Sequence, residues 1–240
     1  ILVLEEISAE WIFNLSSLTN SHPHSITQPR EDNFGIGVFS KAPLAEGEVC
    51  YIGSAGVPSI VATVDAGHSR FRLLATHPLP PGGRDYSRKR NEQLEQLAAY
   101  IRSPLPILLI GDLNVTPWSF HFRRLLAHSG LRDSARGFGL QPTWPSFSMP
   151  LRIPIDHCLH SSEIVIVDRR VGESVSSDHY PLIVDFTIGS LLRQETPARA
   201  AGDRIDGDRF GITALEPKRT AGMEAASFRR TDGGRDIALE

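Results

Sequence analysis

The fold is decided by ILLIGDLN, residues 107–114, where a short apolar run ends in two polar side chains. Apolar runs of this length and composition are typical of buried strands. Asp112 and Asn114 are two positions apart, so in extended chain their side chains face the same way. The stretch therefore predicts a buried strand that carries a carboxylate and a carboxamide to one edge of a sheet.

Polar side chains border four further apolar runs in the same manner. Because strand ends at one edge of a sheet can converge, side chains that are far apart in the sequence can share one cleft. We therefore expect one polar site built from several strand ends. The runs and their polar neighbours are residues 1–4 with Glu6, 71–75 with His77, 153–155 with Asp156, and 180–184 with the preceding Asp178 and His179.

Strand-like and helix-like segments alternate along the chain, and several neighbouring strands are separated only by turn residues. This pattern favours a mixed sheet over a doubly wound parallel one. Residues 87–102 predict a helix with Leu94, Leu97 and Ala98 on one face. Residues 118–129 predict another, and Gly130 fits the position that ends it.

The order and wording of the polar clusters resemble the endonuclease/exonuclease/phosphatase superfamily, which includes DNase I-like nucleases, abasic-site endonucleases, sphingomyelinases and inositol polyphosphate phosphatases. Gly-Asp-x-Asn alone would be weak, but Thr-His-Pro upstream and Ser-Asp-His-x-Pro downstream make the match specific. The resemblance implies an α/β (α+β) fold, a four-layer α/β/β/α sandwich with two mixed β-sheets. It runs from Ile1 to about Phe186 and rests on Leu4–Ile7, Asn33–Lys41, Thr76–Pro78, Gly111–Asn114, Ile155–His157 and Ser177–Leu182.

The resemblance also implies metal-dependent hydrolysis of phosphodiester or phosphomonoester bonds. A phosphodiester repels nucleophiles, so a catalyst must hold a cation, activate water and neutralise the charge that develops. Mg²⁺, with Mn²⁺ as an alternative, prefers oxygen ligands, and Glu6 and Asp178 are the expected pair. Only one of the adjacent Glu5 and Glu6 should point into the cleft, since side chains alternate along a strand.

The remaining clusters supply the expected catalytic groups. The family pattern assigns Asp112 to orienting or deprotonating the attacking water and Asn114 to donating to a phosphoryl oxygen. Asp156 should raise the pKa of His179, so that a protonated imidazole binds the scissile phosphate. His77 matches a phosphate-contacting histidine of DNase-like members.

Simpler interpretations of the same residues stay open. Asp112 and Asn114 also suit an Asx turn that caps the following helix, and Glu6 suits a surface acid. His157 should point away from the side that Asp156 faces, so we expect it to be structural. Other candidates for phosphate contact, with a solvated helix face as the favoured alternative, are Arg84, Arg88 and Arg90. Asn33, in a family-like stretch, is a candidate to approach the cleft.

Composition bears on the substrate. With 240 residues, 40% hydrophobic and 22% charged, the chain is an ordinary globular protein that can bury a full core. Its net charge of −3 lacks the basic surplus usual for proteins that bind duplex DNA non-specifically. The absence of a basic surplus favours small or lipid phosphoesters as substrates but does not exclude a nuclease. Two cysteines, Cys50 and Cys158, are too few for a disulfide framework.

We expect one domain over residues 1–190 and a disordered tail over residues 191–240, where Ala, Gly, Arg, Asp and Glu dominate. A buried-strand pattern at the first residue indicates that the family's first strand is missing. Localisation stays open between cytoplasmic and membrane-attached through a segment upstream of residue 1. The expected partner is a phosphoester substrate (nucleic acid, phospholipid or small phosphate), with no obligate protein partner and a monomeric state. The alternatives are a membrane-associated, sphingomyelinase-like phospholipid phosphodiesterase and a non-catalytic phosphate-binding module.

Overall fold

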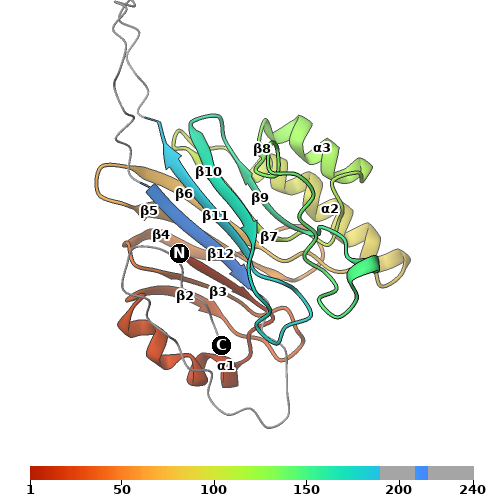
Figure 1. Cartoon of the computed structure of the whole chain (residues 1–240), viewed down its shortest axis with the longest axis horizontal. Coiled ribbons are helices and arrows are strands. Elements are labelled where there is room, and N and C mark those ends of the chain that lie inside the picture. Colours follow the sequence, from red (N-terminus) through yellow and green to blue (C-terminus); the bar gives the residue numbers. More distant parts are fainter. Residues whose placement is uncertain (190–208, 216–240) are drawn as a thin grey trace, which may run out of the picture.

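The computed structural model describes residues 1–189 and 209–215, which form two six-stranded β-sheets (Figure 1). Sheet A has the strand order β10-β11-β12-β1-β3-β2, and sheet B has the order β4-β5-β6-β7-β9-β8. Sheet A consists of β10 (Ile164–Val171), β11 (Leu182–Ile188), β12 (Arg209–Leu215), β1 (Leu2–Glu5), β3 (Ile36–Ser40) and β2 (His24–Gln28). Sheet B consists of β4 (Leu44–Tyr51), β5 (Pro58–Asp65), β6 (Arg70–Thr76), β7 (Ile107–Asp112), β9 (Asp156–His160) and β8 (Arg132–Asp133).

Both sheets are mixed. β1 runs parallel to β12 and β6 runs parallel to β7, whereas the other neighbouring strands described are antiparallel. β4, β5 and β6 follow one another as antiparallel neighbours, and helix α2 (Arg84–Tyr100) makes the long connection that parallel β6 and β7 require. The mixed sheets expected from the sequence are confirmed.

The space between the two sheets holds the main apolar core. Side chains alternate along each strand, so the inward residues of both sheets meet here. The rings of Phe71 and Phe186 contact edge to face with centroids 5.5 Å apart, which is a favoured aromatic geometry. The fully buried members include Val3, Val38, Ile60, Phe71, Leu108, Val184, Phe186 and Ile212.

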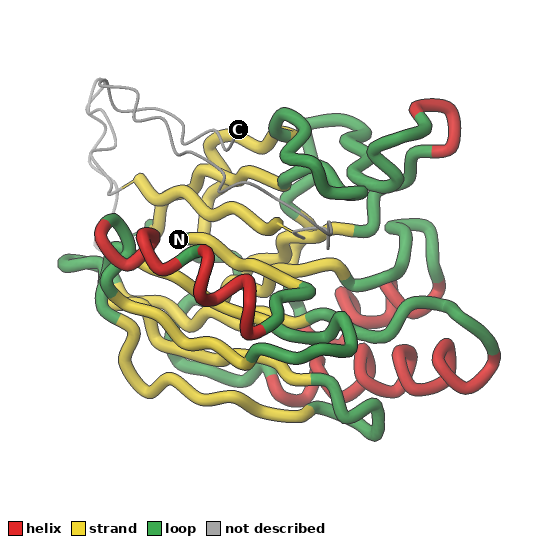
Figure 2. The backbone as a smooth tube through the Cα atoms, turned by 90° about the horizontal axis from the view of Figure 1, so that it is seen from below, coloured by secondary structure: helices red, strands yellow, loops and turns green. Residues whose placement is uncertain are grey.

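Helices cover the outer faces of the sheets, as Figures 1 and 2 show. Leu97 of α2 and Phe122 of α3 (Phe120–Ser129) pack with Leu109 on the outer face of sheet B. On sheet A, Leu4 packs with Leu18 of the 3₁₀ turn η1 (Ser16–Asn20), next to α1 (Ala9–Asn14). The four-layer α/β/β/α sandwich is therefore confirmed.

Local sequence sets the ends of the helices. The Ser119 hydroxyl accepts a hydrogen bond from the His121 N–H at 3.2 Å and so caps α3. Gly130 ends α3 in a left-handed conformation with φ 73°, as expected for a glycine at that position. Ser8 caps α1 by accepting from the Trp11 N–H.

The C-terminal segment differs from the sequence expectation. Residues 209–215 fall in the stretch expected to be a disordered tail, yet they form β12 between β11 and β1. Phe210, Ile212 and Ala214 pack in the core between the sheets, and the amino group of Ile1 donates to the carbonyl of Gly211 at 3.0 Å. The apolar residues Phe210, Ile212 and Ala214 alternate with Gly211 and Thr213, as in a half-buried strand, and β1 and β11 on both sides stabilise it. The rest of the expected tail, residues 191–208 and 216–240, lies outside the described residues.

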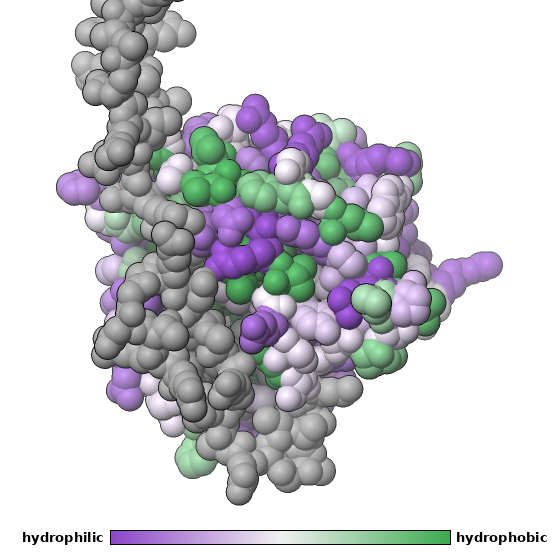
Figure 3. All heavy atoms as spheres, in the orientation of Figure 1, coloured by the Kyte–Doolittle hydropathy of each residue, from purple (hydrophilic) through white to green (hydrophobic). Residues whose placement is uncertain are grey.

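Where described residues form the face seen in Figure 3, hydrophobic and hydrophilic residues are interspersed. Large exposed apolar side chains instead occur in separate segments, among them Phe13 on α1 and Phe147 with Met149 before β9. None of the helices within the described part of the chain is long and apolar enough to cross a membrane.

Candidate active site

Strand ends from both sheets meet at one place. β6 and β7 are parallel, so His77 after β6 and Asp112 at the end of β7 reach the same edge of sheet B. β9 is antiparallel to β7 and begins with Asp156 opposite Asp112. Sheet A contributes Glu5 and Glu6 from the end of β1, and Asp178 and His179 from the loop before β11.

Asp112 lies between two imidazoles. Its Oδ2 is 3.9 Å from Nε2 of His77 and 3.9 Å from Nε2 of His179. All three side chains are buried. Burial, together with the negative charge of Asp156, holds the pKa of Asp112 well above its ordinary range. Once ionised, such a carboxylate is a stronger base than a surface aspartate, which suits a group that takes a proton from water.

His179 and Asp156 form a direct pair, with Nδ1 of the imidazole 2.9 Å from Oδ2 of the carboxylate. Burial alone would lower the pKa of His179. The charge and hydrogen bond of Asp156, helped by Asp112 and Asp178, instead raise it from 6.5 to about 9. Burial would also raise the pKa of Asp156, but its contact with His179 outweighs this and lowers the pKa. His179 is therefore an imidazolium at neutral pH, with Nε2 on the side of Asp112.

His77 has the opposite protonation state. Burial, and then the positive charge of His179, lower the pKa of His77 to about 4. The imidazole is therefore neutral at neutral pH and can donate from one ring nitrogen and accept at the other. Asp112 thus has a cationic imidazole on one side and a neutral one on the other.

Asn114 turns the chain just beyond β7. Its conformation is left-handed with φ 52°, its N–H donates to Oδ1 of Asp112 at 2.6 Å, and its Nδ2 donates to the carbonyl of Pro78 at 3.0 Å. The chain leaves the extended conformation at Asn114, so the extended geometry expected for Asp112 and Asn114 does not continue to the second residue. The Asx turn considered as an alternative is present, although Ser119 rather than this pair caps the next helix.

Arg90 holds the backbone of Asn114. Its Nη1 donates to the carbonyl of Asn114 at 2.7 Å, and its side chain is partly buried. Arg88 instead pairs with Asp85 at 2.7 Å on the exposed face of α2, and Arg84 is also exposed. Of the two interpretations given to these arginines, the solvated face applies to Arg88, whereas Arg90 contacts the candidate site.

Glu6 and Asp178 are the carboxylates on the solvent side of the site. Both are half-buried, and burial, followed by the charge of Asp178, raises the pKa of Glu6. Mg²⁺ often binds through one or two carboxylates in addition to water and substrate phosphate. A divalent cation would neutralise the repulsion between the carboxylates of Glu6 and Asp178, so the residues present fit such an ion. Within the described residues, no group of three or more His, Cys, Asp or Glu side chains is arranged to hold a metal ion.

Glu5 lies beneath the site and supports the backbone of Asp112, a role that the sequence did not indicate. Its side chain is fully buried, and its Oε2 accepts a hydrogen bond from the backbone N–H of Asp112 at 2.9 Å. Burial raises the pKa of Glu5 well above 4.5, against the lowering effect of that hydrogen bond. The contact joins β1 of sheet A to β7 of sheet B. It also needs Gly111, whose φ is 151°, because a Cβ there would collide with the Glu5 carboxyl group and the Thr76 carbonyl.

Two aromatic contacts of the site carried no signal in the sequence. The ring of Phe34 lies 5.6 Å from that of His77, and the ring of Trp144 lies 6.3 Å from that of His179. Asn33, the candidate next to Phe34, is exposed with φ 67°.

His157 is structural, as expected. Its Nε2 lies 2.7 Å from the carbonyl of Val115, which accepts from it. Its ring packs on Phe122 at 4.3 Å. It therefore points toward α3 and the outer core of sheet B, not toward the candidate site.

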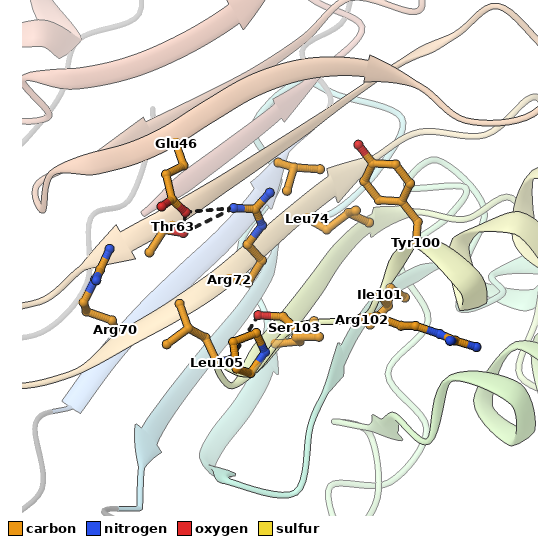
Figure 4. A pocket seen from close by; sticks show the side chains of 13 residues that line it. Glu46, Thr63, Arg70, Arg72, Leu74, Tyr100, Ile101, Arg102, Ser103 and Leu105 are labelled. Atoms are coloured by element: carbon orange, nitrogen blue, oxygen red, sulfur yellow. Dashed lines mark hydrogen bonds and ion pairs between the residues drawn. The ribbon is translucent and has the colours of Figure 1, made fainter.

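A cavity of about 430 Å³ lies away from these residues (Figure 4). It is lined by the beginnings of β6 and β7 and by the end of α2, at the opposite end of the strands from His77 and Asp112. Within it, Arg72 pairs with Glu46 at 3.3 Å and donates to Thr63 at 3.3 Å. Since a carboxylate already neutralises this arginine, the cavity adds nothing to the chemistry of the candidate site.

Comparisons with known proteins agree with this fold. The model of the Endonuclease/Exonuclease/phosphatase family matches residues 1–179. An endonuclease/exonuclease/phosphatase from Beutenbergia cavernae has a TM-score of 0.63 and 21% identity; the match covers 78% of this chain but only 62% of that protein. The human Nocturnin catalytic domain has a TM-score of 0.62 and 16% identity, and the match covers 78% of this chain and 80% of that domain. Sphingomyelinase C from Streptomyces griseocarneus has a TM-score of 0.55 and 16% identity, and the match covers 88% of this chain and 81% of that protein. A comparison with curated protein sequences gave no significant match.

Proposed function

The chain belongs to the endonuclease/exonuclease/phosphatase family, and from this premise we propose that it is a divalent-metal-dependent phosphoesterase whose central base is Asp112. One observation carries the proposal. The buried Asp112 carboxyl group lies 3.9 Å from a neutral imidazole, His77, and 3.9 Å from an imidazolium, His179. A base flanked by a cation that Asp156 holds in place is what hydrolysis of an anionic ester requires.

In the proposed reaction, Asp112 orients a water molecule for in-line attack on phosphorus and accepts its proton. The P–O bond to the leaving alkoxide breaks on the opposite side as the new bond forms, and the alkoxide takes up a proton from solvent. His179 donates from Nε2 to a phosphoryl oxygen and offsets the negative charge that develops there. Asp156 keeps that imidazole protonated and oriented, and His77 binds a further oxygen through its neutral ring. A Mg²⁺ or Mn²⁺ ion held by Glu6 and Asp178 would supply additional neutralisation of the phosphate charge.

Asn114 and Arg90 position the base. The Asn114 N–H fixes one oxygen of Asp112 at 2.6 Å, and Arg90 fixes the Asn114 carbonyl at 2.7 Å. This leaves Oδ2 of Asp112 directed at the two imidazoles, where the water would lie. The second N–H of the Asn114 carboxamide can donate to the substrate.

Single-turnover hydrolysis of bis(4-nitrophenyl) phosphate in Mg²⁺ tests the assignment. Asp112→Asn and His179→Ala should each lower kcat by at least ~10²-fold while the far-UV circular dichroism stays unchanged. His128→Ala, an exposed histidine on α3, is the matched control and should keep the full rate. A near-normal rate for Asp112→Asn would reject the central role of this carboxyl group.

The alternative of a non-catalytic phosphate-binding module makes a different prediction for the same protein. It predicts that inorganic phosphate binds, that His179→Ala weakens this binding, and that no phosphodiester is turned over in any divalent metal. Nucleic acids, phospholipids and small phosphates remain the candidate substrate classes, and a feature beside the site bears on the choice among them.

A further inference from the structure

An exposed apolar segment borders the candidate site. We propose that Phe147, Met149 and Leu151, here called the apolar tip, insert into the surface of a lipid bilayer and bring the site to the phosphoesters of lipid headgroups. This inference rests on the proposed phosphoesterase function and names the substrate class on which that function would act.

The tip is built of large side chains held in water. Phe147 is 76% exposed, Met149 78% and Leu151 69%. The run from Pro142 to Leu151 contains no ionisable side chain. Moving apolar surface of this kind from water into an apolar phase lowers the free energy, and a cluster of such residues marks an interaction surface.

The segment cannot easily fold back to bury these side chains. Its base is fixed to the loop before β11, because the Ser146 N–H donates to the carbonyl of Asp178 at 2.7 Å and the Ser146 hydroxyl donates to the carbonyl of Ser177 at 2.7 Å. Trp144 pairs with Ile153 across the two ends of the segment. The 3₁₀ turn η2 (Met149–Leu151) contains Pro150, which further restricts the backbone.

The same anchors place the tip beside the candidate site. Asp178, which holds the base of the segment, is one of the two carboxylates on the solvent side. Trp144, at the start of the segment, has its ring 6.3 Å from that of His179. In Figure 1 the short green helix of this segment projects from the end of the molecule to which the arrowheads of β10 and β12 point. A surface bound by the tip would therefore lie next to the catalytic groups.

The chemistry of the tip fits a lipid bilayer better than a nucleic acid. Nucleic-acid surfaces rely on cations and on several aromatic rings for stacking, whereas the tip has no cation and one aromatic ring. At its base is a single cation, Arg152, whose guanidinium lies 4.4 Å from the centroid of the Tyr180 ring. Apolar side chains ahead of a cationic residue suit the boundary between acyl chains and phosphate headgroups.

Vesicle binding by the full 240-residue chain tests the proposal. Sonicated vesicles of phosphatidylcholine, and of phosphatidylglycerol, are sedimented with wild type and with the triple variant Phe147→Ser/Met149→Ser/Leu151→Ser. The matched control is Phe13→Ser/Val165→Ser/Val167→Ser, which removes three apolar side chains exposed by 78%, 56% and 44% elsewhere. Wild type and control should sediment alike, and the tip variant should bind at least ~10-fold more weakly.

Activity separates this inference from the proposed function. All three proteins should hydrolyse soluble bis(4-nitrophenyl) phosphate equally, and only the tip variant should lose hydrolysis of vesicle phospholipid. Absence of soluble activity in all three would count against the phosphoesterase itself. Soluble activity with equal vesicle binding by wild type and tip variant would overturn the membrane role of the tip. Loss of single-stranded DNA binding, or of a dimer in size-exclusion chromatography, with no vesicle binding by wild type would likewise overturn it in favour of a nucleic acid or a second copy.

Discussion

The charge of His179 depends on Asp156, and the substitution Asp156→Asn tests this dependence. The pair is buried with a 2.9 Å contact, and the pKa of His179 is about 9 instead of 6.5. At 1.36 kcal/mol per pH unit, this difference corresponds to about 3 kcal/mol in favour of the imidazolium. Asparagine keeps the shape of the partner but removes its charge, so only the charges of Asp112 and Asp178 then oppose burial, and the pKa of His179 should fall by roughly 2 pH units.

The direct assay is NMR titration of the imidazole in protein kept free of divalent metal by a chelator. Linkage gives a second observable. Because the folded-state pKa is raised, the stability that His179 contributes is fully present below pH 6.5 and is lost as pH rises through 9. Between pH 6.5 and pH 9, the free energy of unfolding of wild type should fall by up to about 3 kcal/mol through His179, and that of the variant should not show this fall. Asp168→Asn, at a carboxylate paired with Arg170 on β10, is the control. A pKa for His179 that stays near 9 in Asp156→Asn would refute the reasoning.

Three further predictions concern the surrounding structure. Glu5→Gln keeps an acceptor for the Asp112 N–H but removes a carboxyl group whose pKa burial raises above 4.5, so wild type should lose stability relative to the variant as pH rises above 4.5. Thermal unfolding at pH 4 and pH 8 checks this, and a wild type that gains stability relative to the variant between the two pH values contradicts it. Ile212→Ala should cost about 2–5 kcal/mol in urea unfolding, since Ile212 is fully buried in β12, and a cost below 1 kcal/mol would show that β12 does not pack on the domain. Chelation by EDTA should abolish hydrolysis, and Glu6→Gln should raise the Mg²⁺ concentration needed for half-maximal rate; an unchanged titration would remove Glu6 from the ligands.

Much of the fold could be predicted from sequence because its signals are local. The run of residues 107–110 is apolar enough to define β7 by itself, and Ser119 and Gly130 cap α3 through contacts within a few residues. The resemblance also pointed to Asp156 and His179, which the structure brings to 2.9 Å. The order of the motifs along the chain therefore predicts this contact, even though 23 residues separate Asp156 from His179.

Most of the misses depend on contacts that no local pattern contains. β12 is the exception, because Phe210, Ile212 and Ala214 alternate with Gly211 and Thr213 as in a strand, and the Ala-, Gly- and Arg-rich composition around it outweighed this short pattern. Glu5 bonds to Asp112 across 107 residues and between two sheets. The left-handed turn at Asn114 places its amide on the Pro78 carbonyl, which an extended-chain argument cannot foresee.

The parallel pairing of β1 with β12 constrains how the domain folds. Leu2 lies opposite Thr213, so sheet A is complete only when the two ends of the described chain meet. β4, β5 and β6 of sheet B pair as sequence neighbours. Short loops close faster than long ones, so we expect the β4-β5-β6 hairpins to gain protection from hydrogen exchange first and the hydrogen bonds between β1 and β12 to gain it last. During synthesis, the apolar face of residues 1–5 then has its permanent parallel neighbour only after residue 215 has left the ribosome.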